Sequence, residues 1–185
     1  MSRIRALDPP YEPEVAGCLA AMMPPGQPPI RLFRTFARNL PMTTAMREWG
    51  AYELGRTLSL SRREREIVID RTCALCGCEY EWGVHTAFFA ERAKLSQPQV
   101  FSLVHGFATD PCWTEERERL LILAADALHA SATIDDALWG RLTDAFEQAE
   151  LLDLLMLCGW YHAISYAANA ARVELEDWAP RFVDA

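Results

Sequence analysis

The chain has few signs of β-structure. It contains no sustained alternation of apolar and polar residues, and no Asn-Gly or Asp-Gly pair of the kind that closes a β-hairpin. Apolar residues instead recur at helical spacing, between breaks such as the proline-rich segment 24–29. The sequence therefore predicts an all-α fold, and a length of 185 residues predicts a single domain with a sizeable core.

Basic blocks and leader segments are also missing. The chain carries 18 basic and 26 acidic residues, which gives a net charge of −8 at pH 7, and this balance argues against nucleic acid or an anionic membrane as a partner. The first ten residues have no apolar core of signal-peptide length, so we expect a cytoplasmic location. In a reducing compartment, six cysteines are expected to be free, catalytic or metal-binding rather than paired.

The most apolar run of the chain, residues 151–171, approaches the length that spans a membrane. It also contains Asp153, His162 and Asn169 and is rich in alanine. We therefore predict a helix buried in the core or in a subunit interface, and no membrane contact.

We expect three parts along the chain. Residues 1–39 are expected to form an N-terminal arm and short helices, residues 40–175 the main helical domain, and residues 176–185 a C-terminal tail. Within the domain, Ser61–Glu64 is a capping box that predicts a helix start. A further helix is predicted from about residue 78 to residue 94.

Reactive side chains are concentrated between Glu66 and His85. Glu66 belongs to a helix that Gly77 is expected to end, because glycine readily adopts the left-handed conformation found after helices. Cys78, Glu81 and His85 then follow at positions i, i+3 and i+7, on one face of a second helix. If the two helices face each other, these four candidate catalytic side chains converge. Cys78 would also lie in a first helical turn, where the helix dipole favours a thiolate.

This spacing resembles the signature of the carboxymuconolactone decarboxylase / AhpD-like family. Its alkylhydroperoxidase members have Glu, eleven residues, Cys, two residues, Cys, three residues and His. Glu66, Cys78 and His85 stand at matching positions, and Glu81 replaces the second cysteine. The run around Glu81 is similar to a "YEW…H" subgroup, and the resemblance covers about residues 40–175. It implies an AhpD-like helical fold in a homo-oligomer (a dimer, trimer or hexamer).

The resemblance implies one of two activities, and the first is a peroxiredoxin-like, antioxidant thiol oxidoreductase. Glu66 and His85 would relay a proton that activates a thiol. Cys78 would then form a disulfide with Cys73 or Cys76, which make up a C-x-x-C pair just upstream. The competing interpretation of these two cysteines is that they are small buried hydrophobic residues.

The second activity is a cofactor-free acid–base reaction, such as decarboxylation of a carboxylated lactone. Glu66 or His85 would act as the acid or base, and Glu81 would steer charge. Arg71 is available to hold a substrate carboxylate. A non-catalytic alternative is a buried Glu–His network that only joins two helices of an oligomeric protein.

Four further residues are weaker candidates for lining a substrate pocket. Tyr80 and Trp82 could form an aromatic wall, although packing explains them equally well. His162 and Asn169 are seven residues apart and share one stripe of the apolar helix. The expected partners are thus a small-molecule substrate and further copies of the chain.

Metal binding is a third interpretation of the same region. Cys73, Cys76, Cys78 and His85 are residue types that zinc prefers. A zinc site usually needs a second pair of ligands from elsewhere in the chain, and no other C-x-x-C pair is present. The sequence therefore predicts no metal site and no cofactor.

Overall fold

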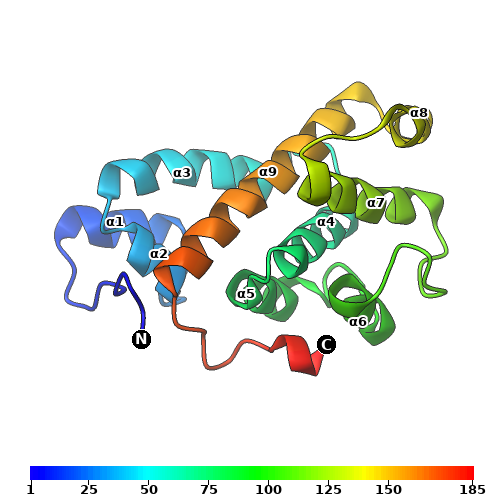
Figure 1. The fold of residues 1–185 in the computed structure, drawn as a ribbon. Coiled ribbons are helices and arrows are strands. Elements are labelled where there is room, and N and C mark those ends of the chain that lie inside the picture. The colour runs from blue at the N-terminus through cyan, green and yellow to red at the C-terminus, as the bar shows by residue number, and fades with distance from the viewer.

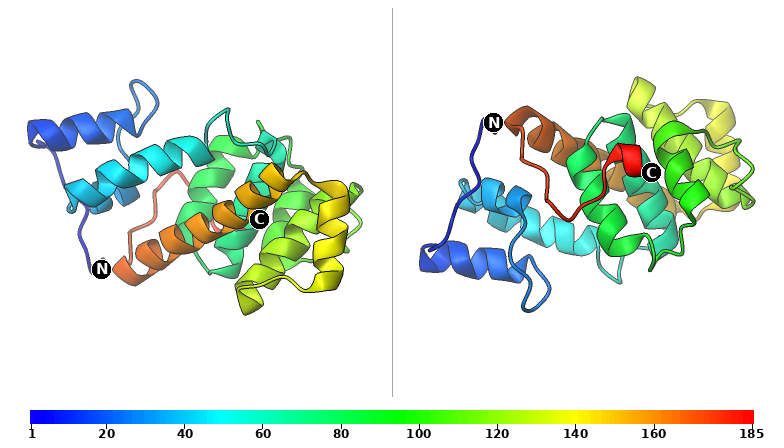
Figure 2. Two further views of the ribbon diagram at one scale, coloured as in Figure 1. Left: turned by 90° about the horizontal axis from the view of Figure 1, so that it is seen from above. Right: turned by 90° about the horizontal axis from the view of Figure 1, so that it is seen from below.

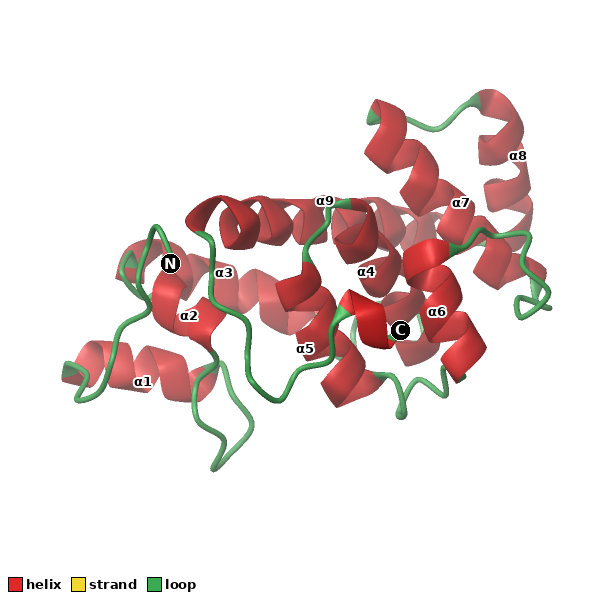
Figure 3. Ribbon diagram, turned by 60° about the horizontal axis from the view of Figure 1, so that its bottom comes forward, coloured by secondary structure: helices red, strands yellow, loops and turns green.

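The computed structural model describes all residues, 1–185, and consists of helices and loops without strands (Figure 3). The predicted all-α class and single domain are confirmed. The helices are α1 (Pro13–Ala21), α2 (Arg31–Phe36), α3 (Leu40–Glu53), α4 (Arg62–Leu75), α5 (Glu79–Phe89), α6 (Gln97–His105), α7 (Glu116–Ser131), α8 (Asp136–Ala145), α9 (Gln148–Ala171) and a short 3₁₀ helix (Phe182–Asp184).

Helix α4 is the centre of the fold. It packs against α5, α6, α7 and α9 (Figure 1), and nine consecutive residues from Arg65 to Cys73 are buried. The predicted capping box starts this helix: Glu64 N–H donates to Ser61 Oγ at 3.3 Å, and Ser61 N–H donates to a Glu64 carboxylate oxygen at 2.9 Å. Because α4 is covered on all sides, every polar residue on it must find a partner inside the protein.

The break between α4 and α5 is a Schellman motif. Gly77 has φ +59°, its N–H donates to Ala74 O at 2.9 Å, and Cys78 N–H donates to Cys73 O at 2.8 Å. The predicted stop at Gly77 is confirmed, and Cys78 becomes the N-cap residue of α5. Helix α5 ends at Phe89, so the prediction of a helix to residue 94 is wrong, since turns follow and Lys94 adopts φ +56°.

Helix α9 crosses the whole molecule (Figures 1 and 2). Its N-terminal half lies beside α7 and α8, and its C-terminal half lies beside α1–α3, which gather at one end of the molecule. Its length and mean hydropathy of 1.2 would suit a membrane span, but half of that window is buried inside the protein, as in a core helix.

Both termini pack onto the helices. Arg3 N–H donates to Ala171 O at 2.7 Å, which holds the N-terminal arm on the end of α9. The C-terminal tail runs along α5 to a place beside α6 (Figure 3), where Phe182 stacks on Trp82 with ring centroids 5.2 Å apart. A Cβ atom at Gly83 would lie 2.5 Å from Pro180 O, so the tail can approach α5 this closely only over a glycine.

Candidate active site

A buried ion pair joins α4 to α5. His85 Nδ1 lies 2.8 Å from Glu66 Oε2, and Arg65 Nε donates to Glu66 Oε1 at 2.9 Å. Glu66 is fully buried and His85 is only 3% exposed. Since a carboxylate oxygen can only accept, His85 Nδ1 carries the proton of this bond. The predicted convergence of α4 and α5 side chains is therefore realised around the imidazole of His85.

The second nitrogen of His85 faces two further groups. His85 Nε2 lies 3.1 Å from Tyr161 Oη on α9 and 3.6 Å from Glu81 Oε1 on α5. The other carboxylate oxygen of Glu81 is buried without a partner, and Tyr161 is 2% exposed. The imidazole is thus held between two carboxylates and a phenol contributed by three helices.

These carboxylates favour the charged form of His85. Burial disfavours the imidazolium, but Glu66 and Glu81 outweigh that cost and raise the pKa of His85 to about 10. For Asp70 on α4 the neutral form is favoured instead. Burial and the nearby Glu66 raise the pKa of its carboxyl well above the ordinary value. At neutral pH His85 is therefore an imidazolium with a proton on each ring nitrogen, and the surroundings of Asp70 favour its neutral form.

A cavity of about 580 Å³ opens onto this site. Glu81, His85 and Tyr161 form its polar end. Most of the remaining wall is apolar and comes from α1–α3 and their loops, from α5 and from α9, with contributions from Met23, Phe33, Phe36, Met46, Phe88 and Trp160. Pockets for small organic molecules have this composition, with a few convergent polar groups in an apolar enclosure.

Two arginines line the same cavity. Arg47 from α3 is half-buried and pairs with Glu48 at 2.7 Å, and Arg92 follows α5 and is exposed. No other positively charged side chain except His85 lines the cavity. These two guanidinium groups give the otherwise apolar cavity a means to hold an anionic group of a ligand.

The cysteines of the predicted redox centre lie outside this cavity. Cys73 and Cys78 have 0% exposure, and burial raises the pKa of Cys78 to about 11. Burial also raises the pKa of Cys73 well above its ordinary value. Cys76 is partly exposed, and all six thiols are free in the structure. A nucleophilic thiol needs an accessible thiolate, which the surroundings of Cys73 and Cys78 disfavour.

Arg71, Tyr80 and Trp82, expected near the substrate, have structural partners instead. Arg71 donates to Asp126 at 2.6 Å and to Leu103 O at 3.1 Å, which ties α4 to α7 and α6. The hydroxyl of Tyr80 donates to Glu176 at 2.7 Å, and Trp82 is fully buried under the C-terminal tail. None of the three lines the cavity.

His162 and Asn169, also expected to line the pocket, have partners elsewhere. Asn169 Nδ2 donates to Cys76 O at 2.9 Å, and His162 Nε2 lies 3.1 Å from His129 Nδ1. Neither residue lines the cavity. The four residues Cys73, Cys76, Cys78 and His85 do not form a metal-binding group. The one cluster with metal-ligand geometry consists of Cys76, His129 and His162.

Sequence reasoning missed Tyr161, Arg65 and the N-terminal wall of the cavity. Tyr161 belongs to an apolar helix and is 76 residues away from His85, so no local spacing connects the two. The one signal in the sequence was the hydroxyl group of Tyr161 within a core helix, because a buried phenol needs a hydrogen-bond partner. The residues of α1–α3 gave no signal, because apolar residues there are as typical of core packing as of a ligand wall.

Three solved structures share this fold. A peroxidase-related protein from Silicibacter sp. TM1040 has a TM-score of 0.80 at 19% identity, covering 97% of this chain and 96% of that one. The debrominase Bmp8, as a cysteine-to-alanine variant in complex with 2,3,4-tribromopyrrole, has a TM-score of 0.79 at 13% identity, covering 96% and 94%. Its apo form has a TM-score of 0.74 at 15% identity, covering 95% and 92%. A search of curated protein sequences finds no match.

Fold and site together define a class of protein, a single helical domain in which a Glu–His pair between two helices faces an apolar cavity. Residues 42–126 match the sequence model of the carboxymuconolactone decarboxylase family. The matched segment contains Glu66, Cys78, Glu81 and His85 and ends before Tyr161. The family recognised from residue spacing is confirmed, and the "YEW…H" subgroup stays a prediction.

Proposed function

We propose that this protein is an enzyme that catalyses proton transfer at His85, with decarboxylation of a small carboxylated lactone or a related acid as the leading reaction. The observation that carries this proposal is the position of His85. Its imidazole lies at the wall of the main cavity, between Glu66 and Glu81, whereas Cys78 is buried outside the cavity. Groups that touch the cavity can touch a substrate.

His85 is suited to act as a general acid. Glu66 holds Nδ1–H, so the imidazole ring cannot rotate, and Nε2–H remains to be donated into the cavity. In a decarboxylation, the bond between carbon and the carboxylate breaks, carbon dioxide leaves, and the electron pair stays on the substrate carbon. That carbon takes the Nε2 proton, and solvent returns a proton to His85. Glu66 and Glu81 stabilise the imidazolium before transfer, and Tyr161 positions Nε2.

The cavity restricts the substrate class. Its largely apolar wall favours a compact ring or chain with little polar surface, and Arg47 or Arg92 can pair with an acidic group. The debrominase Bmp8 was solved with 2,3,4-tribromopyrrole, which supports a small cyclic ligand for this fold. A small carboxylated lactone meets both requirements.

The test is a panel of carboxylated lactones and related small acids, incubated in D₂O with product analysis by NMR. We expect release of carbon dioxide and deuterium at the former carboxylated carbon. His85→Ala and Glu81→Gln should lower the rate by about 10²–10⁴-fold, the usual contribution of a general acid. Cys78→Ser and the exposed control His105→Ala should retain the rate. Full activity of His85→Ala, or loss in Cys78→Ser, would refute the assignment.

A thiol peroxidase is the second candidate. One observation favours it: Cys78 is the N-cap residue of α5, where the helix dipole stabilises a thiolate that becomes exposed. In that reaction the Cys78 thiolate attacks a peroxide oxygen, an alcohol or water leaves, and Cys76 or Cys73 displaces water from the sulfenic acid to form a disulfide. One equivalent of peroxide should then consume two thiols, with a mapped Cys78 disulfide. If all six thiols survive, this candidate fails.

We also propose that the chain forms a homo-oligomer through α9. The helix exposes an apolar stripe at regular spacing, with Leu152 64% exposed, Met156 49% and Tyr166 65%. Such a stripe is typical of a helix that packs against another copy. Met156→Glu should convert the oligomer to monomers in light-scattering measurements, and the exposed control Glu91→Lys should not. The unpaired thiols support the proposal of a cytoplasmic location.

A further inference from the structure

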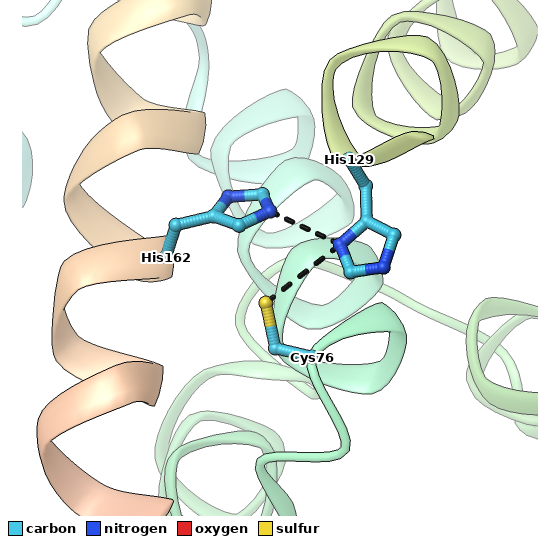
Figure 4. A group of neighbouring side chains, drawn as sticks. All are labelled: Cys76, His129 and His162. Carbon is cyan, nitrogen blue, oxygen red and sulfur yellow. Dashed lines mark hydrogen bonds between the residues drawn. The ribbon is translucent and has the colours of Figure 1, made fainter. Parts of the chain in front are cut away.

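A second cluster of reactive side chains lies outside the cavity. Cys76 stands at the C-terminal end of α4, His129 in the last turn of α7, and His162 in the middle of α9 (Figure 4). None of the three lines the cavity at His85. We propose that Cys76, His129 and His162 bind a divalent transition-metal ion, with Zn²⁺ as the natural occupant.

The distances between the three ligand atoms fit one ion. His129 Nδ1 lies 3.1 Å from His162 Nε2 and 3.9 Å from Cys76 Sγ, and all three atoms lie within 4.8 Å of one another. With zinc bonds of roughly 2.1 Å to nitrogen and 2.3 Å to sulfur, tetrahedral geometry needs about 3.4 Å between nitrogens and about 3.6 Å between nitrogen and sulfur. The distances from His129 Nδ1 to the other two atoms therefore need to change by about 0.3 Å each, and the distance between His162 Nε2 and Cys76 Sγ, at most 4.8 Å, by no more than about 1.2 Å.

The three ligand atoms hydrogen-bond only to one another, and the other hydrogen bonds around the cluster orient their residues. His162 Nδ1 lies 2.8 Å from Cys158 O, and since a carbonyl only accepts, the proton sits on Nδ1 and the lone pair on Nε2 points at the cluster. Asn169 Nδ2 donates to Cys76 O at 2.9 Å and holds the backbone of the third ligand. Metal-binding histidines usually have such a second partner, which orients the ring.

The charged side chains nearest the cluster do not occupy its ligand atoms. Arg71 and Asp126 are close to His129, but they pair with each other at 2.6 Å. Neither side chain forms a hydrogen bond to a ligand atom of the cluster. Zn²⁺ would displace the thiol proton of Cys76, which is released to solvent as the Zn–S bond forms.

The donor set selects the kind of metal. Two imidazoles and one thiolate suit Zn²⁺, Co²⁺, Ni²⁺ and copper, whereas Mg²⁺ and Ca²⁺ require oxygen ligands. Three protein ligands leave a fourth position for water, which can reach the cluster because Cys76 is partly exposed and His129 exposed. The Cys76 thiolate, once bound to zinc, is no longer available for a disulfide with Cys78.

The test begins with full-length protein stripped by a chelator and titrated with Co²⁺ and Zn²⁺. We expect one ion per chain, a thiolate-to-Co²⁺ charge-transfer band, and a higher Tm with Zn²⁺. Removing a residue that only hydrogen-bonds to a metal ligand weakens metal binding by at least roughly tenfold. His129→Ala and His162→Ala remove ligands themselves, so they should weaken Zn²⁺ binding by at least that factor. Cys76→Ser should abolish the charge-transfer band.

Two matched controls lie outside the cluster. His105→Ala removes an exposed histidine, and Cys112→Ser removes the other partly exposed thiol. Both should bind Zn²⁺ like the wild type. Alkylation gives an independent readout, because Zn²⁺ should protect Cys76 and leave Cys112 reactive. If the cluster variants and the controls bind Zn²⁺ equally, or Zn²⁺ leaves Cys76 reactive, the site does not exist. Neither result bears on catalysis at His85.

Discussion

His85 Nδ1 and Glu66 Oε2 lie 2.8 Å apart in the core of the protein, between the two helices that meet at Gly77. Both side chains are almost completely buried, so neither charge is stable there without the other. Arg65 balances Glu66 on its other oxygen, and Glu81 balances His85 on its other nitrogen. The consequence is a fixed imidazolium whose one accessible proton faces the cavity.

The protonation of His85 is the first testable consequence. The ¹⁵N spectrum of the wild type should show an imidazolium at about pH 8, because Glu66 and Glu81 raise the pKa of His85 to about 10. In Glu66→Gln the ring should be neutral at that pH, since the strongest counter-charge is gone. Glu91→Gln, an exposed carboxylate elsewhere, is the control. A neutral ring in the wild type would contradict the charge assignment.

The same pair predicts how stability depends on pH. The folded-state pKa of His85, about 10, lies above its unfolded value of about 6.5. Its contribution to stability is therefore fully present below about pH 6.5 and is lost as pH rises towards about 10. Urea unfolding across this range should show the decrease in the wild type and a smaller one in Glu66→Gln.

Glu53 on α3 gives a second pH prediction. It is fully buried, neither carboxylate oxygen has a partner, and burial with the nearby Asp153 raises the pKa of Glu53 to about 7. The folded state holds this proton more tightly than the unfolded state, so stability decreases as pH rises from about 4.5 to about 7. Glu53→Gln, which cannot ionise, should be more stable at about pH 8 by on the order of 2 kcal/mol.

Urea unfolding at several pH values checks the Glu53 prediction. The difference between Glu53→Gln and the wild type should shrink below about pH 5, where the wild-type carboxyl is protonated in both states. Glu48→Gln, on the exposed face of the same helix, should follow the wild type at every pH. A constant difference at all pH values would mean that ionisation of Glu53 plays no part.

Thiol accessibility separates the cysteines into two groups. In metal-free folded protein, Cys76 and Cys112 should react first with a thiol reagent, because they are the two partly exposed cysteines. Cys18, Cys73, Cys78 and Cys158 are buried and should react only as the protein opens. Peptide mass mapping after a short exposure distinguishes them. Early labelling of Cys78 would show that its surroundings open readily, and would favour the peroxidase candidate.

Gly77 predicts a stability effect that depends on backbone conformation. Its φ of +59° suits glycine, so Gly77→Ala should cost about 1–2 kcal/mol although no atom lies within 4 Å of the new Cβ. Gly140 in α8 also has open space but an ordinary φ, so Gly140→Ala should stabilise the protein by about 0.5–1 kcal/mol. Thermal unfolding of both variants measures this contrast, and equal effects would exclude the conformational cause.

Local signals in the sequence predicted much of the fold. The capping box at Ser61 and the glycine at position 77 form hydrogen bonds only to residues three to five positions away. Such local signals can be read from the sequence because they do not depend on the rest of the chain. The end of α5 shows the limit of this reasoning. No residue between positions 89 and 94 forbids a helix in the sequence. In the structure, Arg63 from α4 donates to the carbonyl oxygens of Ala93 and Lys94 in the turn that replaces it.

The sequence by itself determined where most helices form and that Glu81 and His85 share one face of a helix, because helical periodicity relates positions seven or fewer residues apart. Only the tertiary structure decided what those side chains meet. Cys78 is buried outside the cavity, and Tyr161 of α9 contacts His85 of α5. His129 and His162 lie close to Cys76, although the three residues belong to different segments of the chain. These contacts depend on how helices pack against one another, and no local spacing in a single sequence encodes that.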